Sequence, residues 1–384
     1  MVFDNYIMDW SVFTKFSFGL VAFSVFFIAL MVQLWYYFAY FSRLAFYKKK
    51  EVQENTPPAS IIICARNEDD NLVEFLPRIF EQEYPEFEVV VVNDCSYDNT
   101  ADFLKEFAKK HDNLKIVTIK EDEYYSHGKK VALMMGIKGA THEHLLLTDA
   151  DCKPNSKDWL RSMMQHFSTE TEIVLGYGAY EKKAGFLNKL IRFDTFMIAL
   201  QFLSFSLARK TYMGTGRNLA YKKSLFFKMK GFASHYYIES GDDDLFVNEA
   251  ATKQNSKIEV SVDTHTISKV KKTFKGWFRQ KRRHITTFKH YNAGSKFRLM
   301  AMSMSQYFFF ISFIIALILQ FQPLVVLSLF AFRLLIQIII FNKSMKLLAE
   351  KDLLFLTPII EFTLLIVYPM ISISNMFMKK NKWK

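Results

Sequence analysis

The feature that most constrains this chain is a run of uncharged residues near its beginning, from Phe16 to Ser42. Its 27 residues exceed the roughly 20 that an α-helix needs to cross a bilayer. Acidic residues precede the run, its apolar core is long and no small-residue cleavage site follows, which argues against a signal peptide. Basic residues follow at Arg43 and 48–50. This charge pattern predicts a short external tail (1–15), a transmembrane helix (16–42) and a cytosolic chain thereafter.

Further apolar segments lie near the C-terminus, within residues 301–378. The charge-free run 299–332 continues as an apolar stretch to Phe341 and is too long for one span. Residues 320–323 are therefore predicted to form a hairpin between spans 303–320 and 323–341, and a last span covers 353–378. Four crossings would place the basic tail 379–384 outside, against the charge rule. Either the last segment is re-entrant or interfacial, or the tail did not decide the topology.

Two charged residues interrupt these C-terminal segments. Arg333 lies eight residues before Phe341, and Glu361 lies eight residues after Leu353. In antiparallel helices both would lie about 12 Å from the cytosolic face, at roughly 1.5 Å per residue. Charged side chains are costly alone in a bilayer. We therefore predict that Arg333 and Glu361 pair within the membrane and that they mark a path for a lipid acceptor.

The chain between the membrane segments alternates between short buried strands and amphipathic helices. The strands are predicted at 59–64, 88–93, 114–119 and 144–148, and the helices at 72–80, 101–110 and 129–140. Continuous Val, Ile and Leu runs between helices are typical of a parallel sheet that is covered on both faces. Such sheets bind ligands at the carboxyl ends of their strands.

The net charge of +12 suggests a polyanionic partner, and the basic residues are concentrated in one region. Eleven Lys and Arg fall between Lys269 and Arg298, and no acid occurs from Thr264 to Ala349. Because this region directly precedes a membrane span, we interpret 266–300 as an interfacial helix region on the anionic cytosolic leaflet rather than a nucleic-acid site. The three cysteines fit neither a disulfide framework nor a zinc site.

Acidic residues follow the predicted strands. Asp149 and Asp151 point the same way from an extended segment, which suits Mg²⁺ or Mn²⁺. Lys129 opens a helix, where a phosphate can bind. Asp242, Asp243 and Asp244 are adjacent, so the pKa of at least one is expected to be raised, as a general base requires.

The order of these motifs resembles glycosyltransferase family 2, the inverting enzymes with the GT-A fold. It is most similar to the membrane branch of ceramide glucosyltransferase-like and cellulose, chitin and hyaluronan synthase-like enzymes. The resemblance covers residues 57–300. It rests on the segments 65–68 (ARNE), 93–100 (NDCSYDNT), 128–129 (GK), 149–151 (DAD), 214–218 (GTGRN), 242–245 (DDDL) and 280–284 (QKRRH). The implied fold class is α/β, a Rossmann-like GT-A cytosolic domain at 57–265 with flanking transmembrane helices.

The resemblance also implies the roles of individual residues. The nucleotide sugar would be bound by Asn67, Glu68, Asp94, Lys129, Asp149, Gln280 and Arg283. A divalent cation, Mg²⁺ or Mn²⁺, would be bound by Asp149 and Asp151. The catalytic base would be Asp242, with Asp243 able to share that role, and Gly216, Asn218 and His284 would face the acceptor.

Two positions depart from the family pattern. Gly241 replaces the first acid of the family's Glu-Asp pair. His284 replaces the tryptophan of Q-x-x-R-W, which weakens the interpretation as a processive polymer synthase.

The expected function is a membrane-bound inverting transferase that moves a sugar from a UDP- or GDP-sugar to a hydroxyl of a lipid or lipid-linked glycan at the cytosolic leaflet. The setting would be a bacterial inner or cell membrane, with no nucleic-acid partner. One alternative is a small processive polysaccharide synthase. Another, of a different class, is an inactive membrane scaffold of an envelope-assembly complex.

Overall fold

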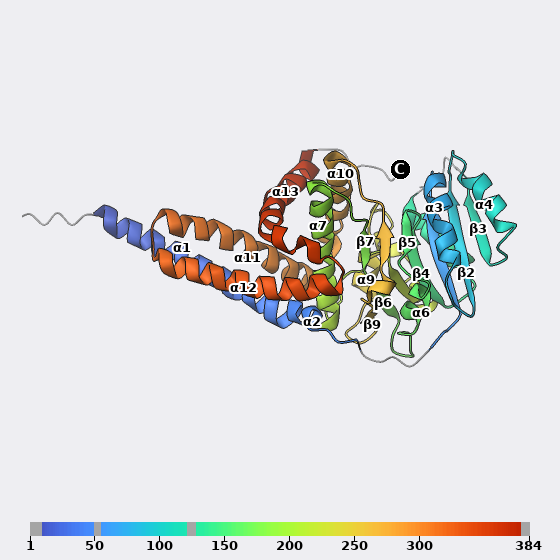
Figure 1. Ribbon diagram of the computed structural model, residues 1–384, viewed down its shortest axis with the longest axis horizontal. Coiled ribbons are helices and arrows are strands. Elements are labelled where there is room, and N and C mark those ends of the chain that lie inside the picture. The colour runs from blue at the N-terminus through green and yellow to red at the C-terminus, as the bar shows by residue number, and fades with distance from the viewer. Residues whose placement is uncertain (1–9, 50–54, 121–127, 378–384) are drawn as a thin grey trace, which may run out of the picture.

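The computed structural model describes residues 10–49, 55–120 and 128–377. The molecule is elongated, with a bundle of long helices at one end and an α/β unit at the other (Figure 1). Most of the predicted external tail and the basic tail 379–384 lie outside the described residues.

A seven-stranded sheet forms the centre of the α/β unit, in the order β3-β2-β1-β4-β8-β6-β9. The first four strands in sequence are mutually parallel, and β8 turns antiparallel to β4. The strands of this sheet are β1 Ala59–Ala65, β2 Phe87–Asp94, β3 Leu114–Ile119, β4 His144–Asp149, β6 Ile173–Leu175, β8 Leu219–Lys222 and β9 Ser256–Ile258. All four strands predicted from the apolar runs are confirmed.

A small second sheet has the order β5-β10-β7. Its strands are β5 Cys152–Pro154, β7 Gly178–Tyr180 and β10 Thr266–Ser268. The expected domain boundary at residue 265 is therefore placed too early, because β10 pairs with β5 and β7 and belongs to the α/β unit.

Helices cover the large sheet on both faces, as continuous apolar strands require. They are α3 Asp69–Phe80, α4 Thr100–Ala108, α5 Lys129–Gly139, α6 Trp159–Met164, α8 Lys223–Lys228 and α9 Asp244–Ala250. The three predicted helices are α3, α4 and α5. Gly136 lets α5 approach the sheet closely, because a Cβ at this position would lie 2.8 Å from Ile62 and Val92.

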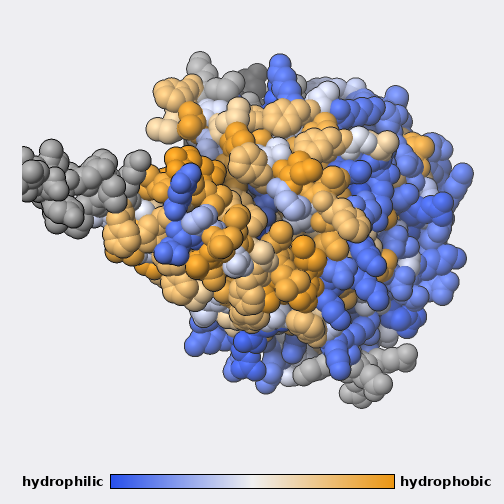
Figure 2. All heavy atoms as spheres, turned by 60° about the vertical axis from the view of Figure 1, so that its left-hand side comes forward, coloured by the Kyte–Doolittle hydropathy of each residue, from blue (hydrophilic) through white to orange (hydrophobic). Residues whose placement is uncertain are grey.

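Three long helices form the projecting bundle. They are α1 Trp10–Tyr36, continued by a π-helical turn Tyr37–Phe41 and α2 Ser42–Ala45, then α11 Ala293–Ile318 and α12 Pro323–Leu347. The predicted hairpin is confirmed by the turn between α11 and α12. Large apolar side chains such as Phe18, Phe308 and Leu324 are exposed on the outside. Figure 2 shows hydrophobic residues gathered over this end of the molecule.

A buried polar cluster lies where the bundle meets the last long helix. Arg333 of α12 and Glu361 form an ion pair of 2.8 Å, and both are at most 5% exposed. Gln337 donates to Glu361 at 2.9 Å, and Gln33 of α1 accepts from Arg333 at 2.8 Å. The predicted pairing of Arg333 with Glu361 is therefore confirmed.

Five helices in the described chain are long and apolar enough to cross a membrane. Besides α1, α11 and α12 they include α7 Phe186–Leu207 and α13 Thr357–Phe377. Most of α7 is buried inside the protein, between the α/β unit and the helical end (Figure 1).

The last helix, α13, is held at both ends by contacts with α7 and α10 (Phe274–Ile285). The turn before it places Glu350 and Asp352 against Arg192 of α7. Near its other end Asn375 donates to the Arg282 carbonyl of α10 at 3.0 Å. Unlike α11 and α12, α13 therefore lies along α7 and α10, which favours the re-entrant or interfacial alternative for this segment.

Candidate active site

The carboxyl ends of the parallel strands bring the predicted donor-side residues to one edge of the sheet. Lys129, the first residue of α5, donates to Asp149 Oδ1 at 2.8 Å and lies 3.2 Å from Asp242 Oδ2. Burial acts to lower the pKa of Lys129, but the charges of Asp149 and Asp242 outweigh it and raise the pKa well above its usual value. Lys129 is therefore a fixed cation between the two acidic motifs.

The three consecutive acids before α9 have different surroundings. Burial acts to raise the pKa of Asp242, but the charge of Lys129 more than offsets this effect and the pKa is lowered. Burial and the charge of Asp242 raise the pKa of Asp243 from 3.8 to about 7. Asp243 accepts from the backbone N–H of Gly216 at 2.7 Å. The expected raised pKa within this acidic run is thus confirmed at Asp243.

Asp244, the third acid, acts as a structural link. It accepts from Thr287 Oγ1 at 2.5 Å and from the Tyr291 hydroxyl at 2.7 Å, and so ties α9 to the segment between α10 and α11.

The structure explains why a glycine, and not an acid, precedes the three acidic residues. Gly241 has φ +94°, and a Cβ there would lie 2.4 Å from Leu245. An acid at this position would be strained.

Asp149 and Asp151 fit a hard divalent cation. Their carboxylate oxygens and Cys152 Sγ all lie within 4.8 Å of one another. Burial, followed by the charge of Asp149, raises the pKa of Asp151, as expected where two carboxylates converge on a cation site. Cys152 Sγ is buried and contacts Ser268 Oγ at 2.9 Å. Since Mg²⁺ and Mn²⁺ prefer oxygen, the two carboxylates are the suitable ligands.

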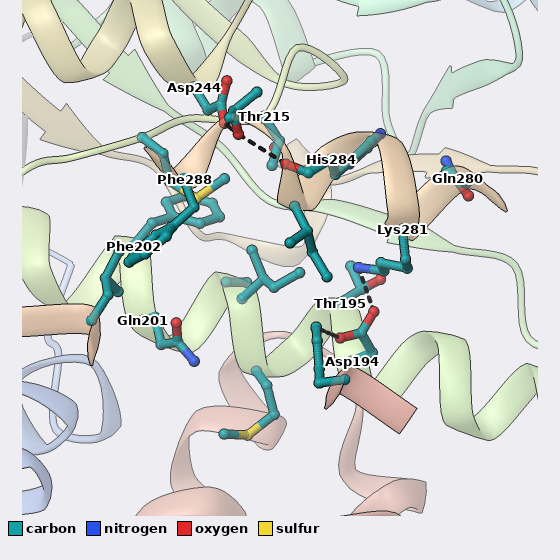
Figure 3. Close-up of a pocket in the computed structure, with 18 of the residues that line it drawn as sticks. Asp194, Thr195, Gln201, Phe202, Thr215, Asp244, Gln280, Lys281, His284 and Phe288 are labelled. Atoms are coloured by element: carbon teal, nitrogen blue, oxygen red, sulfur yellow. Dashed lines mark hydrogen bonds and ion pairs between the residues drawn. The ribbon is translucent and has the colours of Figure 1, made fainter. Parts of the chain in front are cut away.

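One cavity of about 690 Å³ connects the donor-side residues with the helical end of the molecule. Eight of the predicted site residues line it: Lys129, Asp149, Gly216, Asp242, Asp243, Gln280, Arg283 and His284. The opposite wall consists mainly of apolar and neutral polar side chains of α7, α11 and α13, together with the acidic residues Asp194 and Glu361. The cavity volume is in the range of small-molecule sites. Figure 3 shows α10, with Gln280, Lys281 and His284, facing α7 across this space.

The other predicted site residues lie outside the cavity lining. Asp94 is buried at the end of β2, and Glu68 accepts from Asn71 at 2.5 Å. Asn67 is exposed, and it accepts from Tyr97 N at 2.8 Å through its side chain. These residues and Asp151 remain at the same sheet edge, after β1, β2 and β4.

Asn218, expected on the acceptor side, is fully buried instead. Its amide donates to the Tyr177 and Thr264 carbonyls at 3.1 and 2.8 Å, and accepts from Trp159 Nε1 at 3.0 Å. All of its hydrogen bonds go to the protein interior, so we correct this assignment. Asn218 holds the two sheets and α6 together.

Two cavity-lining features escaped the sequence reasoning. Helix α7 carries Asp194, which forms an ion pair with Lys281 of α10 and accepts from the Tyr368 hydroxyl of α13. Arg217 lies in the 214–218 motif, from which only Gly216 and Asn218 were predicted as site residues, and its guanidinium lies 4.3 Å from the centre of the Tyr180 ring. The signal for α7 was present as a 22-residue apolar segment that contains only three charged residues, Lys189, Arg192 and Asp194.

The fold is that of a solved glycosyltransferase. A mannosyltransferase from Pyrobaculum calidifontis, solved in complex with GDP-Man and Mn²⁺, superposes with a TM-score of 0.59 at 18% identity. The alignment covers 94% of this chain and 99% of that chain. This similarity establishes a GT-A-like α/β fold with long apolar helices.

Sequence comparison identifies the family. Residues 60–229 match the family model described as Glycosyl transferase family 2, and this part of the chain belongs to glycosyltransferase family 2.

Two curated relatives have different products in their names. The poly-beta-1,6-N-acetyl-D-glucosamine synthase of Staphylococcus epidermidis is 36% identical over 111 residues, 29% of this chain and 25% of that protein. The beta-monoglucosyldiacylglycerol synthase of Nostoc sp. is 31% identical over 124 residues, 32% of this chain and 26% of that protein. The matches span about a quarter of each relative, so they do not distinguish a polymer product from a glycolipid.

Proposed function

We propose that this chain is a membrane-bound inverting glycosyltransferase that moves a sugar from a nucleotide sugar to a hydroxyl of a lipid or lipid-linked glycan at the cytosolic leaflet. The observation that carries the proposal is the continuous cavity of about 690 Å³. It joins Lys129 and Asp242 to apolar side chains of α11 and α13, such as Met304 and Leu364. A lipid acceptor needs this kind of path between a polar reaction centre and helices that can lie in a bilayer.

The donor half of the reaction is assigned to the residues of the sheet edge and α10. Lys129, Gln280 and Arg283 would contact the diphosphate, since guanidinium and ammonium groups are the usual phosphate ligands. Asn67, Glu68 and Asp94 at the neighbouring strand ends would hold the nucleoside. Asp149 and Asp151 would hold Mg²⁺ or Mn²⁺, which supplies charge neutralisation for the leaving diphosphate.

The transfer itself is a single displacement with Asp242 as the base. The acceptor hydroxyl attacks the anomeric carbon from the face opposite the diphosphate, and its proton goes to the Asp242 carboxylate. The bond between the anomeric carbon and the diphosphate oxygen breaks, and the nucleoside diphosphate leaves with the electron pair. Arg283 and Lys129 stabilise its developing charge. The configuration at the anomeric carbon is inverted.

For the membrane, we propose three crossings, by α1, α11 and α12, with the α/β unit on the cytosolic side. Helix α13 would lie at the interface beneath that unit, since it contacts α7 and α10 along its length. This topology leaves the tail 379–384 on the cytosolic side, where the positive-inside rule places it.

A small processive polysaccharide synthase is the second candidate, favoured by the similarity to the staphylococcal synthase. Two observations weigh against it. His284 stands where the family's synthase-like members have tryptophan, and Gln306 of α11 donates to Glu361 of α13 at 2.6 Å, which ties these two helices together in the cavity lining.

The testing experiment is a donor screen on the full chain in lipid nanodiscs, with UDP- and GDP-sugars, Mg²⁺ or Mn²⁺, and nucleotide release as the readout. The lipid fraction is then analysed for labelled product. We expect single sugars on lipid with one donor, and none with Asp242→Asn. Long polymers would favour the synthase. Full cellular function in both Asp149→Ala and Asp242→Asn would favour the scaffold.

A further inference from the structure

The cavity has an acceptor half, which we define as the part of its lining that comes from α7, α11 and α13 together with Lys281 of α10. Most of these side chains are apolar, and the neutral polar ones include Gln201, Ser303 and Ser372. Amide and hydroxyl groups of this kind suit hydroxyl and ester oxygens of a lipid headgroup. The charged groups of this half determine which headgroups it can accept.

Lys281 is the cation that the acceptor half could offer to a lipid phosphate, but Asp194 neutralises it. The Lys281 ammonium contacts the Asp194 carboxylate directly, and the Tyr368 hydroxyl donates to the other carboxylate oxygen. Lys281 is 9% exposed and Asp194 1% exposed. Figure 3 shows the two side chains pointing toward each other between α10 and α7. A phosphate that drew Lys281 away would leave the buried Asp194 carboxylate without a counter-charge, which is strongly unfavourable.

The charges of the whole cavity lining also disfavour a negatively charged acceptor. Among the lining residues of the described chain, four side chains are cationic and seven are acidic. Lys129 already contacts Asp149 and Asp242, and Glu361 is held by Arg333 outside the lining. Of the other cations, Arg283 is assigned with Lys129 to the donor diphosphate, and Arg217 donates to Ala179 O at 3.4 Å and to Ser268 Oγ at 3.1 Å. An acceptor that brings its own negative charge would therefore meet a net acidic surface.

We infer that Asp194 is a specificity-determining residue, which makes the acceptor half select an uncharged lipid alcohol over a lipid phosphate by neutralising Lys281. The inference rests on the proposed function and adds the chemical class of the acceptor. An uncharged alcohol also agrees with the placement of Asp242, because an alcohol must lose its proton on attack, whereas a phosphate at neutral pH is already ionised.

The test uses the full-length protein in phosphatidylcholine nanodiscs with its active nucleotide sugar. Diacylglycerol serves as the uncharged alcohol and a polyprenyl phosphate as the lipid phosphate, each alone and in competition. We expect wild-type protein to prefer the alcohol, with little inhibition by the phosphate. Asp194→Asn keeps an acceptor for the Tyr368 hydroxyl but frees Lys281, and should shift the alcohol-to-phosphate ratio, or the phosphate's inhibition constant, by about tenfold. Asp194→Asn combined with Lys281→Gln should restore the wild-type ratio.

The outcomes separate this inference from the proposed function. A wild-type preference for polyprenyl phosphate leaves a lipid glycosyltransferase but overturns the role of Asp194. An unchanged ratio in folded Asp194→Asn also overturns it. If Asp194→Asn does not fold, the competition on wild-type protein decides alone, and strong inhibition by polyprenyl phosphate overturns the inference. Nucleotide release with no sugar on either lipid overturns both proposals.

Discussion

Lys129 Nζ lies 3.2 Å from Asp242 Oδ2, so the cation that we assign to the donor diphosphate is in contact with the carboxylate that we assign as the base. The two residues come from distant segments, the start of α5 and the loop before α9. Their contact fixes both side chains at the donor end of the cavity. The base and the diphosphate ligand are thus positioned by one interaction.

Replacing the proposed base gives the first prediction. Asp242→Asn should reduce sugar transfer by about 10²–10⁴-fold, the usual contribution of a general base. Donor affinity should change much less, because Lys129 keeps its bond to Asp149. Transfer is measured as labelled lipid, and donor binding by calorimetry. Asp244→Ala serves as the contrast, since loss of the links to Thr287 and Tyr291 should appear first as a lower Tm. Equal transfer by Asp242→Asn and wild type would remove Asp242 from the mechanism.

Metal dependence gives the second prediction. Asp149→Ala and Asp151→Ala should each abolish metal-dependent nucleotide release, because the two carboxylates are the oxygen ligands of the proposed site. Chelation of the wild-type protein should have the same effect and should be reversed by added Mn²⁺ or Mg²⁺. Cys152→Ser is the matched control and should retain metal dependence, because its sulfur faces Ser268. Undiminished release in the presence of a chelator would contradict the site.

The ion pair inside the helical end gives the third prediction. Glu361→Gln leaves Arg333 buried without a counter-charge and should destabilise the protein by about 3–5 kcal/mol. Glu361→Arg should be worse still, because it places two cations together. Phe362→Leu, at a neighbouring position that is 50% exposed, should have little effect. Thermal unfolding in detergent measures all three. A Glu361→Arg protein as stable as Glu361→Gln would show that the pair does not stabilise the fold.

The raised pKa of Asp243 gives the fourth prediction. Because the pKa is 3.8 ordinarily and about 7 in the folded protein, the folded state keeps a proton that the unfolded chain loses between these values. The free energy of unfolding should therefore fall as the pH rises from about 4 to 7. Asp243→Asn removes this contribution and should flatten the decline of Tm with pH in metal-free protein. Asp112→Asn, at an exposed position, should keep the wild-type slope. Parallel curves for all three proteins would contradict the assignment.

The topology gives the fifth prediction. A reporter that becomes fluorescent only in the cytosol, fused after Lys384, should fluoresce if α13 does not cross the membrane. The same reporter fused before Met1 should stay dark, because α1 crosses once. The two fusions control for each other in expression and insertion. A dark C-terminal fusion beside a dark N-terminal one would indicate a fourth crossing.

Much of this structure could be predicted from local patterns in the sequence. Apolar runs between amphipathic helices gave β1 to β4 and α3 to α5, because burial on both faces of a parallel sheet imposes that composition. The strand-end rule then placed Asp149 and Lys129 at one edge. Arg333 and Glu361 could be paired because two charges in apolar helices have few other ways to be accommodated.

What the sequence did not predict depends on contacts between distant segments. The apolar residues of α7 gave no sign that the helix lies buried under the α/β unit, with Asp194 aimed at Lys281. Asn218 lies in a glycine-rich motif that is typical of a binding loop, yet its amide is used entirely by Trp159, Tyr177 and Thr264. Hydropathy equally could not decide between a crossing and an interfacial position for α13, because both are compatible with its apolar length.

The position of α13 at the end of the chain has a consequence for biogenesis. Its partners Asp194, Arg282 and Arg333 all precede it in the sequence, so they are synthesised first. The cavity gains its last wall only after the preceding helices and the α/β unit have been made. Until then the apolar lining from α7 and α11 lacks that cover, and a ribosome that stalls before Thr357 would leave a nascent enzyme with its lipid-facing side open.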